Sequence, residues 1–520
     1  MTSTLQTNGY ITDVGYTAGF YPETAPAHLT FAALVAGRAP GGAFRPRRVL
    51  ELGFGQGFGL ALLAAANPDI AFEGCDFNAG HVTHARGLIA TAGLTNLTVT
   101  ESSFEAASAR AHEQVQAPDS GIDVVLLHGI LSWVAQETED AILAILRRRL
   151  RHQGVLYVSY NCMPGWAPLV PIRQLILDIK RMHSGGSEAQ IASALDLLAR
   201  LKQGNAAYFA NNPLAAAHLD SMLGQDRAYL AHEYLDDHWR LFQFSDVAAR
   251  LSRADDLGYI ASATLTENFD QFGVPADLMQ LIAHAGDPVL QETLRDIAAN
   301  KRFRRDVFGR GGESVDAAER RRLLGQMRFA LAVPRQRLVF RFVGPLNELI
   351  GQQEFYAPIA DRLAQGIAGF EELLALPVFG EGAVASLVEC LALLIHSQQV
   401  LPVIASPSAD QEPAKRFNRM VVAQARTGRL YHHLASPVAG TGVRVDDFGL
   451  LTLAAVFDGK AETPAVAAQH GLSIITALGR RPMDQGKTID NDGEAIEFLA
   501  KRMAPVIEDH LPLWQSLGMV

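Results

Sequence analysis

Four glycines at alternate positions follow a short apolar segment in the first eighth of the chain. The segment RRVLEL runs directly into ELGFGQGFG (51–59), which has glycines at 53, 55, 57 and 59. Glycine tolerates positive φ, so such a turn can bring its backbone close to a ligand. Dinucleotide-binding turns need glycines at offsets 0, 2 and 5, but Phe58 stands at offset 5 from Gly53. The Gly-Lys-Ser/Thr sequence that ends a phosphate-binding loop is also missing. The turn therefore favours a ligand other than a dinucleotide or a nucleoside triphosphate.

The region 48–160 alternates between strand and helix patterns. Its expected strands are RRVLEL, IAFEGCDF, LTVTES, GIDVVLLHGI and GVLYVSYN, with stretches of helical apolar spacing between them. This alternation predicts an α/β, Rossmann-like fold in which a parallel sheet carries helices on both faces. Ligands of such sheets bind at the carboxyl ends of the strands, near the point where the strand order reverses.

Most of the remaining chain has helical spacing. Residues 168–183 and 187–203 predict helices, whereas GYIASATL (258–265) predicts a strand. If that strand returns to the sheet, residues of about 180–240 form an insertion; if it does not, they belong to a separate domain. The sequence leaves both arrangements open. We place the domains at 1–180, 181–312 and 313–520, with GRGGES (309–314) as the linker before the third.

The residues around the glycine turn predict a site for S-adenosylmethionine, a sulfonium nucleoside without phosphate. Glu51 carries a charge that suits the ammonium group of this cofactor. Asp76 ends the second expected strand, where its carboxylate can accept both ribose hydroxyls in charge-assisted hydrogen bonds worth about 1.5–3 kcal/mol. The rest of the predicted cofactor set lies in the turn or after the second and third strands, and comprises Gly53, Phe54, Gly55, Gly57, Phe77, Ser103 and Phe104.

Two more strand ends should border the methyl group to be transferred. Methyl transfer depends on alignment of nucleophile, carbon and sulfur, and an aromatic wall lowers the pKa of an amine and attracts a sulfonium. We predict that Trp133 and Tyr160 form this wall and that Asn161 positions the acceptor. His128 shapes the cofactor pocket, serves as general base or has a plain structural role, and His128, Gly129 and Trp133 also count as predicted cofactor contacts.

Composition limits the class of protein. A net charge of −10 argues against a duplex nucleic-acid binder, and the basic stretches 301–305 and 320–322 are interpreted as a solvated helix face paired with acids. The three cysteines are far apart, and no histidine–carboxylate set has metal-ligand spacing, so no metal is expected. The N-terminal sequence resembles no signal peptide and no segment is apolar enough to span a bilayer, so we expect a cytoplasmic protein without a membrane partner.

Taken together, the motifs resemble those of bacterial methyltransferases that carry a methyltransferase regulatory domain, such as the rickettsial outer-membrane-protein lysine methyltransferases. The matching stretches are YTAGFYPETAP (16–26), ELGFGQG, HGILSWV, SYNCMPGW, HEYLDDHWRLFQFSDVAARLSRADDLGYIA, NKRFRRDVF, RFNRMVVAQA and LASPVAGTGVRV. Phe54 departs from the small residue that the family commonly has there. The resemblance implies a class I Rossmann-like methyltransferase domain, a mostly helical middle domain and a winged-helix-like C-terminal domain.

The resemblance also implies N-methylation of lysine side chains in a protein or peptide, with S-adenosylmethionine as donor. By residue-to-residue carry-over it implies cofactor contacts at Tyr16, Glu51, Gly53, Asp76, Phe77, His128 and Trp133. Two alternatives stay open, namely a methyltransferase acting on a peptide natural product or small metabolite, and a DNA-binding regulator built on the C-terminal domain. The apolar and acidic stretch 362–400 disfavours the regulator, because a DNA-reading helix needs several basic side chains.

Overall fold

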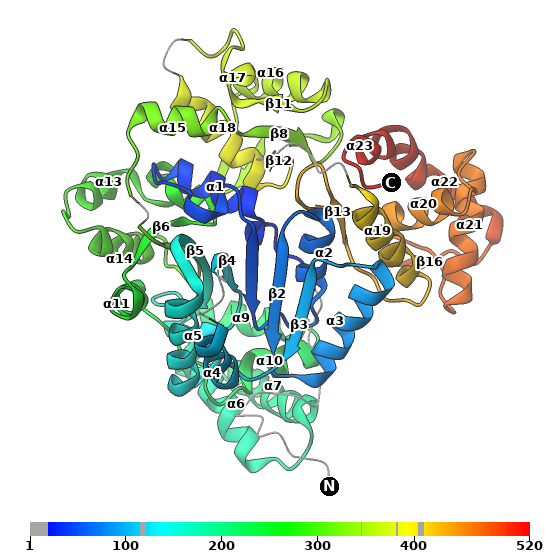
Figure 1. Ribbon diagram of the computed structural model, residues 1–520. Coiled ribbons are helices and arrows are strands. Elements are labelled where there is room, and N and C mark those ends of the chain that lie inside the picture. Colours follow the sequence, from blue (N-terminus) through cyan, green and yellow to red (C-terminus); the bar gives the residue numbers. More distant parts are fainter. Residues whose placement is uncertain (1–18, 115–120, 312, 345, 381–382, 404–409) are drawn as a thin grey trace.

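The computed structural model describes residues 19–520 apart from 115–120, 312, 345, 381–382 and 404–409, and its centre is a seven-stranded sheet (Figure 1). The strands follow the order β3-β2-β1-β4-β5-β7-β6 across the sheet. Their bounds are Arg48–Leu52 (β1), Ala71–Asp76 (β2), Leu97–Glu101 (β3), Ile122–Leu127 (β4), Leu150–Asn161 (β5), Leu257–Ser262 (β6) and Phe303–Arg310 (β7). The α/β fold predicted from the sequence is thus present.

Strand β7 runs against its two neighbours. Strands β1 to β5 are parallel to one another, whereas β7 pairs antiparallel with both β5 and β6. The strand order reverses between β1 and β4, so the carboxyl ends of these two strands mark the expected ligand site.

The two faces of the sheet are covered by different helices. One face packs against α1 (Pro26–Val35), α2 (Phe58–Ala66) and α3 (Ala79–Ala92), and the other packs against α5 (Gln136–Arg149) and α11 (Phe244–Asp255). Each core is almost wholly apolar, with β4 buried along its full length between the two layers.

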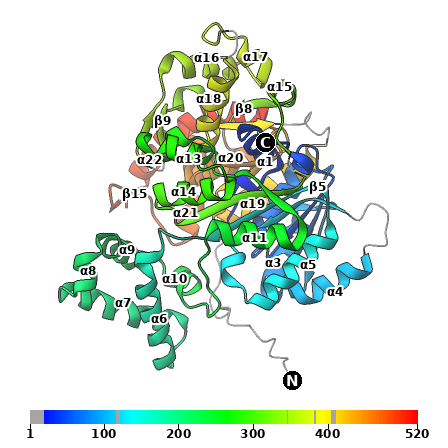
Figure 2. The same cartoon turned by 90° about the vertical axis from the view of Figure 1, so that its left-hand side faces the viewer.

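The strand expected in GYIASATL does join the sheet. It is β6, which lies at the edge beside β7. The helices between β5 and α11 therefore form an insertion that projects from the rest of the molecule (Figure 2). These helices are α6 (Val170–Met182), α7 (Ser187–Gln203), α8 (Ala207–Asn211), α9 (Pro213–Leu223) and α10 (Arg227–Tyr234), and they enclose a core of their own. The domain boundaries at 180 and 312 stay predictions.

The basic stretch 301–305 is not a solvated helix face, and that prediction is wrong. Arg304 lies within β7 and is only 3% exposed. Its guanidinium binds Asp306 at 2.8 Å, Asp296 of α14 (Pro288–Ala298) at 2.5 Å and Glu292 of the same helix at 2.7 Å. Pairing with acids was expected, but it occurs in the core, where the ion cluster ties α14 to the sheet.

The C-terminal region packs directly on the sheet domain. Its described residues combine a three-stranded sheet, in the order β11-β8-β12 with β11 at Ala368–Gly369, with three two-stranded antiparallel sheets and several helices. The bounds of its longer elements are Ala317–Leu324 (α15), Arg328–Leu331 (β8), Gln353–Ala364 (α16), Val384–His396 (α18), Val400–Val403 (β12), Glu412–Ala425 (α19), His433–Ser436 (β13), Thr441–Arg444 (β14), Asp447–Phe457 (α20), Pro464–Ala477 (α21) and Asp492–Pro505 (α22). One hydrophobic cluster continues from α1, α2 and α3 into this region. The winged-helix likeness stays a prediction.

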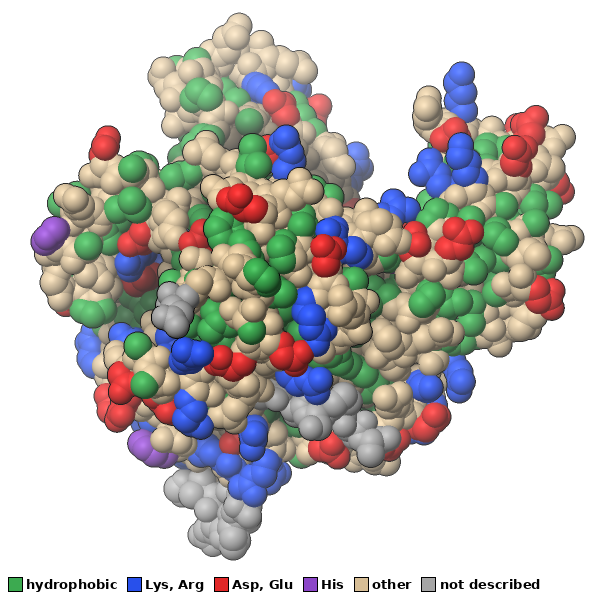
Figure 3. All heavy atoms as spheres, turned by 90° about the horizontal axis from the view of Figure 1, so that it is seen from above, with side chains coloured by type: hydrophobic (Ala, Val, Ile, Leu, Met, Phe, Trp, Pro, Cys, Tyr) green, Lys and Arg blue, Asp and Glu red, His purple; other side chains and the backbone are tan. Residues whose placement is uncertain are grey.

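The surface gives two further observations. On the face seen in Figure 3, basic and acidic side chains are interspersed over most of the area. Among the residues that the structure describes, no helix has both the length and the apolar character needed to cross a bilayer.

Candidate active site

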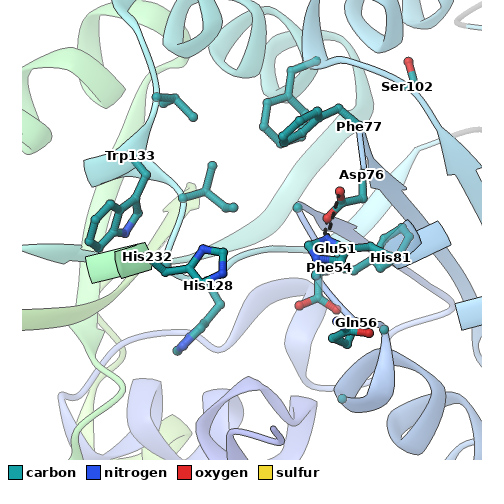
Figure 4. A pocket seen from close by; sticks show the side chains of 18 of the residues that line it. Glu51, Phe54, Gln56, Asp76, Phe77, His81, Ser102, His128, Trp133 and His232 are labelled. Carbon is teal, nitrogen blue, oxygen red and sulfur yellow. Dashed lines mark hydrogen bonds and ion pairs between the residues drawn. The ribbon is translucent and has the colours of Figure 1, made fainter. Parts of the chain in front are cut away.

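A cavity of about 310 Å³ opens at the carboxyl ends of β1 to β4, where the strand order reverses (Figure 4). This volume is at the lower end of the range typical of small-molecule sites. Of the predicted site residues, the cavity lining includes Glu51, Gly53, Phe54, Gly55, Gly57, Asp76, Phe77, Ser103, Phe104, His128, Gly129 and Trp133. Four separate loops thus contribute side chains to one space.

The glycine turn needs its glycines. Gly53, Gly55 and Gly57 have φ of +75°, +58° and +74°, in the left-handed region that disfavours other residues. A Cβ on Gly53 would lie 2.3 Å from Cδ1 of Ile130, whereas one on Gly55 would meet nothing within 4 Å. The turn therefore packs tightly against Ile130 at Gly53 and leaves open space beside Gly55.

Asp76 is fixed at the end of β2 by backbone groups. Its Oδ2 accepts a hydrogen bond from the amide of Gly55 at 2.9 Å, and its Oδ1 accepts one from the amide of Asn78 at the same distance. The side chain is 5% exposed, and Nδ1 of His81 lies 3.4 Å from Oδ1. Each carboxylate oxygen keeps a second lone pair, so the held carboxylate can accept further hydrogen bonds from a ligand.

Glu51 lies at the end of β1 and also lines the cavity. Burial raises the pKa of its carboxyl group to about 8, and the nearby charge of Asp76 adds to the shift. A cation placed beside these two carboxyls would favour the ionised form of Glu51.

The charge of the cavity fits a cationic ligand. Among the described residues that line it, five are acidic and none is Lys or Arg; the acids are Glu51, Asp76, Glu101, Glu105 and Glu233. A phosphate-bearing ligand would find no basic side chain in this lining. A sulfonium nucleoside that also carries an ammonium group would be attracted by carboxylates at both ends of the cavity.

His128 follows β4 and is held in an aromatic stack. Its ring lies 3.7 Å from the ring of Tyr21, and its Nδ1 is 2.9 Å from the hydroxyl of Tyr157 on β5. Burial lowers the pKa of His128 to about 4, so the imidazole is neutral at pH 7 and a weak base. The structure therefore disfavours the general-base role, one of the three predicted for this residue.

Tyr160 and Asn161 do not line the cavity, and their predicted roles there need correction. Tyr160 is 1% exposed and donates its hydroxyl hydrogen bond to Asp306 at 2.6 Å, on the α5 and α11 side of the sheet. Asn161 is 6% exposed, and its backbone amide donates to the hydroxyl of Ser132. Alternate residues of a strand face opposite sides, so Tyr157 and Ser159 lie on the face away from Tyr160, where they contact His128 and accept from the amide of Gly129, respectively. Asn161 shares that face by alternation but is buried at the end of β5.

Several lining residues were not predicted. They come from the segment after residue 18, from the glycine turn, from α3 and from α10 of the insertion, and include Gly19, Tyr21, Thr24, Gln56, His81, His232 and Glu233. Trp133, His128 and His232 lie on one side of the cavity, and Asp76, Phe54, Gln56 and His81 lie on the other (Figure 4). Tyr16, a predicted cofactor contact, lies outside the described residues.

The C-terminal region reaches the glycine turn through His84 of α3. Nδ1 of His84 donates to the carbonyl of Gln56 at 2.6 Å, while its Nε2 lies 3.0 Å from the hydroxyl of Tyr431 and 3.1 Å from Nη1 of Arg429. The ring of Tyr431 also stacks on Phe58, the first residue of α2, at 4.3 Å. The region beyond residue 313 thus supports the glycine turn through these contacts. No group of side chains suited to hold a metal ion occurs in the part of the chain that the structure describes.

Comparison with known proteins agrees with this geometry. Residues 45–214 match the family model described as a methyltransferase domain, and residues 226–310 match that of a predicted methyltransferase regulatory domain. An uncharacterized protein of Synechocystis is 31% identical over 98% of this chain and 99% of its own. The chain belongs to the methyltransferases that carry a methyltransferase regulatory domain. It is an S-adenosylmethionine-dependent methyltransferase of the class I Rossmann-like fold.

Other relatives of this methyltransferase are more distant. An uncharacterized protein of Rickettsia prowazekii is 26% identical over 58% of this chain and 53% of its own length. The structure of PKMT2 from Rickettsia typhi in complex with AdoHcy aligns with a TM-score of 0.67 and 17% identity, covering 95% of this chain and 98% of that one. This likeness shows that the fold is shared along nearly the whole chain. The regulatory-domain match also includes β6 and β7, so that segment supplies two strands of the catalytic sheet.

Proposed function

We propose that this methyltransferase transfers the methyl group of S-adenosylmethionine to lysine side-chain nitrogens of a protein. The observation that carries the proposal is the division of the cavity into two parts. One part contains the half-buried carboxyl of Glu51 and the carboxylate of Asp76, which backbone amides hold in place. The other part is aromatic and contains the neutral imidazole of His128. The name of PKMT2, a rickettsial protein lysine methyltransferase whose fold is shared along nearly the whole chain, supports the same acceptor.

In this proposal the cofactor lies along the glycine turn. The ribose hydroxyls donate to Asp76, whose carboxylate is already oriented by the amides of Gly55 and Asn78. The ammonium group lies beside Glu51. The adenine lies between the residues that follow β2 and β3, namely Phe77, Ser103 and Phe104. S-Adenosylmethionine supplies the activated methyl group at its sulfonium.

The acceptor amine in this proposal enters on the side of Trp133, Tyr21 and His128. An amine attacks only when it is neutral, and an aromatic, poorly hydrated wall lowers its pKa. The same wall attracts the sulfonium through cation–π contact. Because His128 is neutral, it adds no positive charge to repel either partner.

The test is a methyl-transfer assay with tritiated S-adenosylmethionine and a bacterial protein extract. We expect label in the protein fraction and, after proteolysis, mass increments of methyl groups on lysine. Asp76→Asn should lose most of the labelling, while Glu188→Gln, a substitution on an exposed part of α7, should keep it. Label confined to small molecules would contradict the lysine assignment and favour a metabolite or peptide natural product. A protein or peptide partner, a cytoplasmic location and a winged-helix-like C-terminal domain remain parts of the proposal.

A further inference from the structure

One acidic residue of the cavity comes from the helical insertion. Glu233 lies on α10, the last helix of the insertion, and lines the cavity together with its neighbour His232. It belongs to the HEYLDDHW stretch, for which sequence reasoning found no chemical role. The insertion thus reaches the active site through this helix.

Glu233 lies on the acceptor side of the cavity. Burial raises the pKa of the Tyr21 phenol and the charges of Glu23 and Glu233 add to the shift, and Tyr21 stacks on His128 at 3.7 Å. His232 lies beside His128 and Trp133, away from Asp76 (Figure 4). Glu233 follows His232 on α10 and lines the same cavity, which assigns it to the side that α10 contributes.

Glu233 has no counterion among the residues that the structure describes. Arg305, whose charge acts on Tyr21 and His128, is engaged by Glu23 at 2.7 Å. Burial without a compensating charge raises the pKa of Glu233 to about 7. A half-buried carboxyl without a partner costs free energy unless a ligand supplies the positive charge.

Other titratable groups around the acceptor side stay neutral near pH 7 or are already paired. Burial raises the pKa of Tyr229 to about 12 and raises that of Tyr234 further, and the pKa of His128 is about 4. The groups that share the cavity or act on this wall are Tyr21, Glu23, Glu51, His128, Tyr229, His232, Tyr234 and Arg305. Those of these groups that line the cavity include no Lys or Arg that could form an ion pair with Glu233.

We propose that Glu233 binds the ammonium group of the incoming lysine and takes the proton that must leave before attack. The proton moves from the lysine Nζ to the Glu233 carboxylate, and the free amine then attacks the cofactor's methyl carbon. The carbon–sulfur bond breaks with its electron pair going to sulfur, which yields a methylammonium and neutral S-adenosylhomocysteine. Glu233 then releases the proton to water. This inference rests on the proposed lysine N-methylation and deepens it.

A general base matched to neutral pH speeds proton transfer by about 10²–10⁴-fold, so Glu233→Gln should lower kcat about 100-fold at pH 7. The loss should shrink to under about tenfold at pH 9.5, as the solution pH approaches the lysine pKa of about 10.4. The assay uses saturating S-adenosylmethionine and the protein extract above, with lysine methylation read by mass spectrometry. Glu188→Gln on α7 is the matched control, and Glu233→Asp should restore part of the rate because it keeps a carboxylate.

The outcomes separate this inference from the proposed function. An unchanged rate for Glu233→Gln, or a loss of equal size at every pH, would overturn the role of Glu233 while wild-type lysine methylation still stands. A tenfold loss of cofactor affinity in Glu233→Gln would instead move the residue to the cofactor side and also overturn it. If the wild-type protein methylates no lysine, both proposals fail.

Discussion

The affinity of this methyltransferase for its cofactor should depend on pH through Glu51. In the free protein, burial and the neighbouring Asp76 raise the pKa of Glu51 to about 8, so this carboxyl is mostly protonated at pH 7. A bound cofactor brings an ammonium and a sulfonium, which favour the ionised carboxylate and lower its pKa. Binding therefore releases a proton, and the sign of the linkage is that affinity rises as the pH rises toward 8.

The magnitude follows from the fraction of Glu51 that must be deprotonated. With a pKa of about 8 in the free protein, the penalty factor 1 + 10^(8 − pH) falls from about 100 at pH 6 to about 11 at pH 7. The dissociation constant should thus fall about ninefold between these two pH values, or about 1.3 kcal/mol, with release of about 0.9 proton per cofactor at pH 7. The cofactor's own α-amino group, with a pKa of about 7.8, stays mostly protonated in this window.

Calorimetric titrations with S-adenosylmethionine at pH 6.0, 6.5 and 7.0, repeated in buffers of different ionisation enthalpy, measure both quantities. Glu51→Gln should bind more weakly than the wild type at pH 6 and show little change up to pH 7, because its amide mimics the protonated acid and cannot ionise when the cofactor binds. Glu188→Gln should keep the wild-type slope. A wild-type affinity that does not change with pH, or a slope that persists in Glu51→Gln, would refute this reasoning.

Three further substitutions test other parts of the structure. Asp76→Asn should weaken S-adenosylmethionine binding about 10- to 100-fold in calorimetry, since it removes a charged acceptor of ribose hydrogen bonds; unchanged affinity would exclude Asp76 from the ribose site. Arg304→Met leaves Asp306 buried without a counterion and should lower the free energy of unfolding by about 3–5 kcal/mol in urea denaturation. The control Arg181→Met, at an exposed ion pair, should lower it by less than about 1 kcal/mol. Equal losses for the two variants would contradict the burial argument. Trp133→Ala should lower kcat at least about tenfold while the cofactor Kd changes less than about threefold, and the opposite pattern would move Trp133 into the cofactor pocket.

The part of the site that the sequence predicts well is local. The segment from Glu51 to Gly57 and the acid at the end of β2 are recognisable because strand, turn and helix follow one another within a few residues. Parallel strands bring their carboxyl ends to one edge, so these residues converge whatever the rest of the chain does.

Other features depend on tertiary structure. Tyr160 was misplaced because the faces of a strand alternate, and the sequence alone does not show which face of β5 meets the cavity. Glu233 could not be placed because the packing of a helical insertion sets the direction of α10. Arg304 was interpreted as solvated because runs of basic residues usually are, whereas here three acids surround it in the core.

The most direct test of the central claim is a crystal structure of the protein soaked with S-adenosylhomocysteine. We expect density for the nucleoside along the turn of Gly53 to Gly57, with both ribose hydroxyls within hydrogen-bonding distance of Asp76 and the sulfur directed toward His128 and Trp133. A cavity that stays empty at saturating ligand, or a nucleoside bound elsewhere on the chain, would contradict the account.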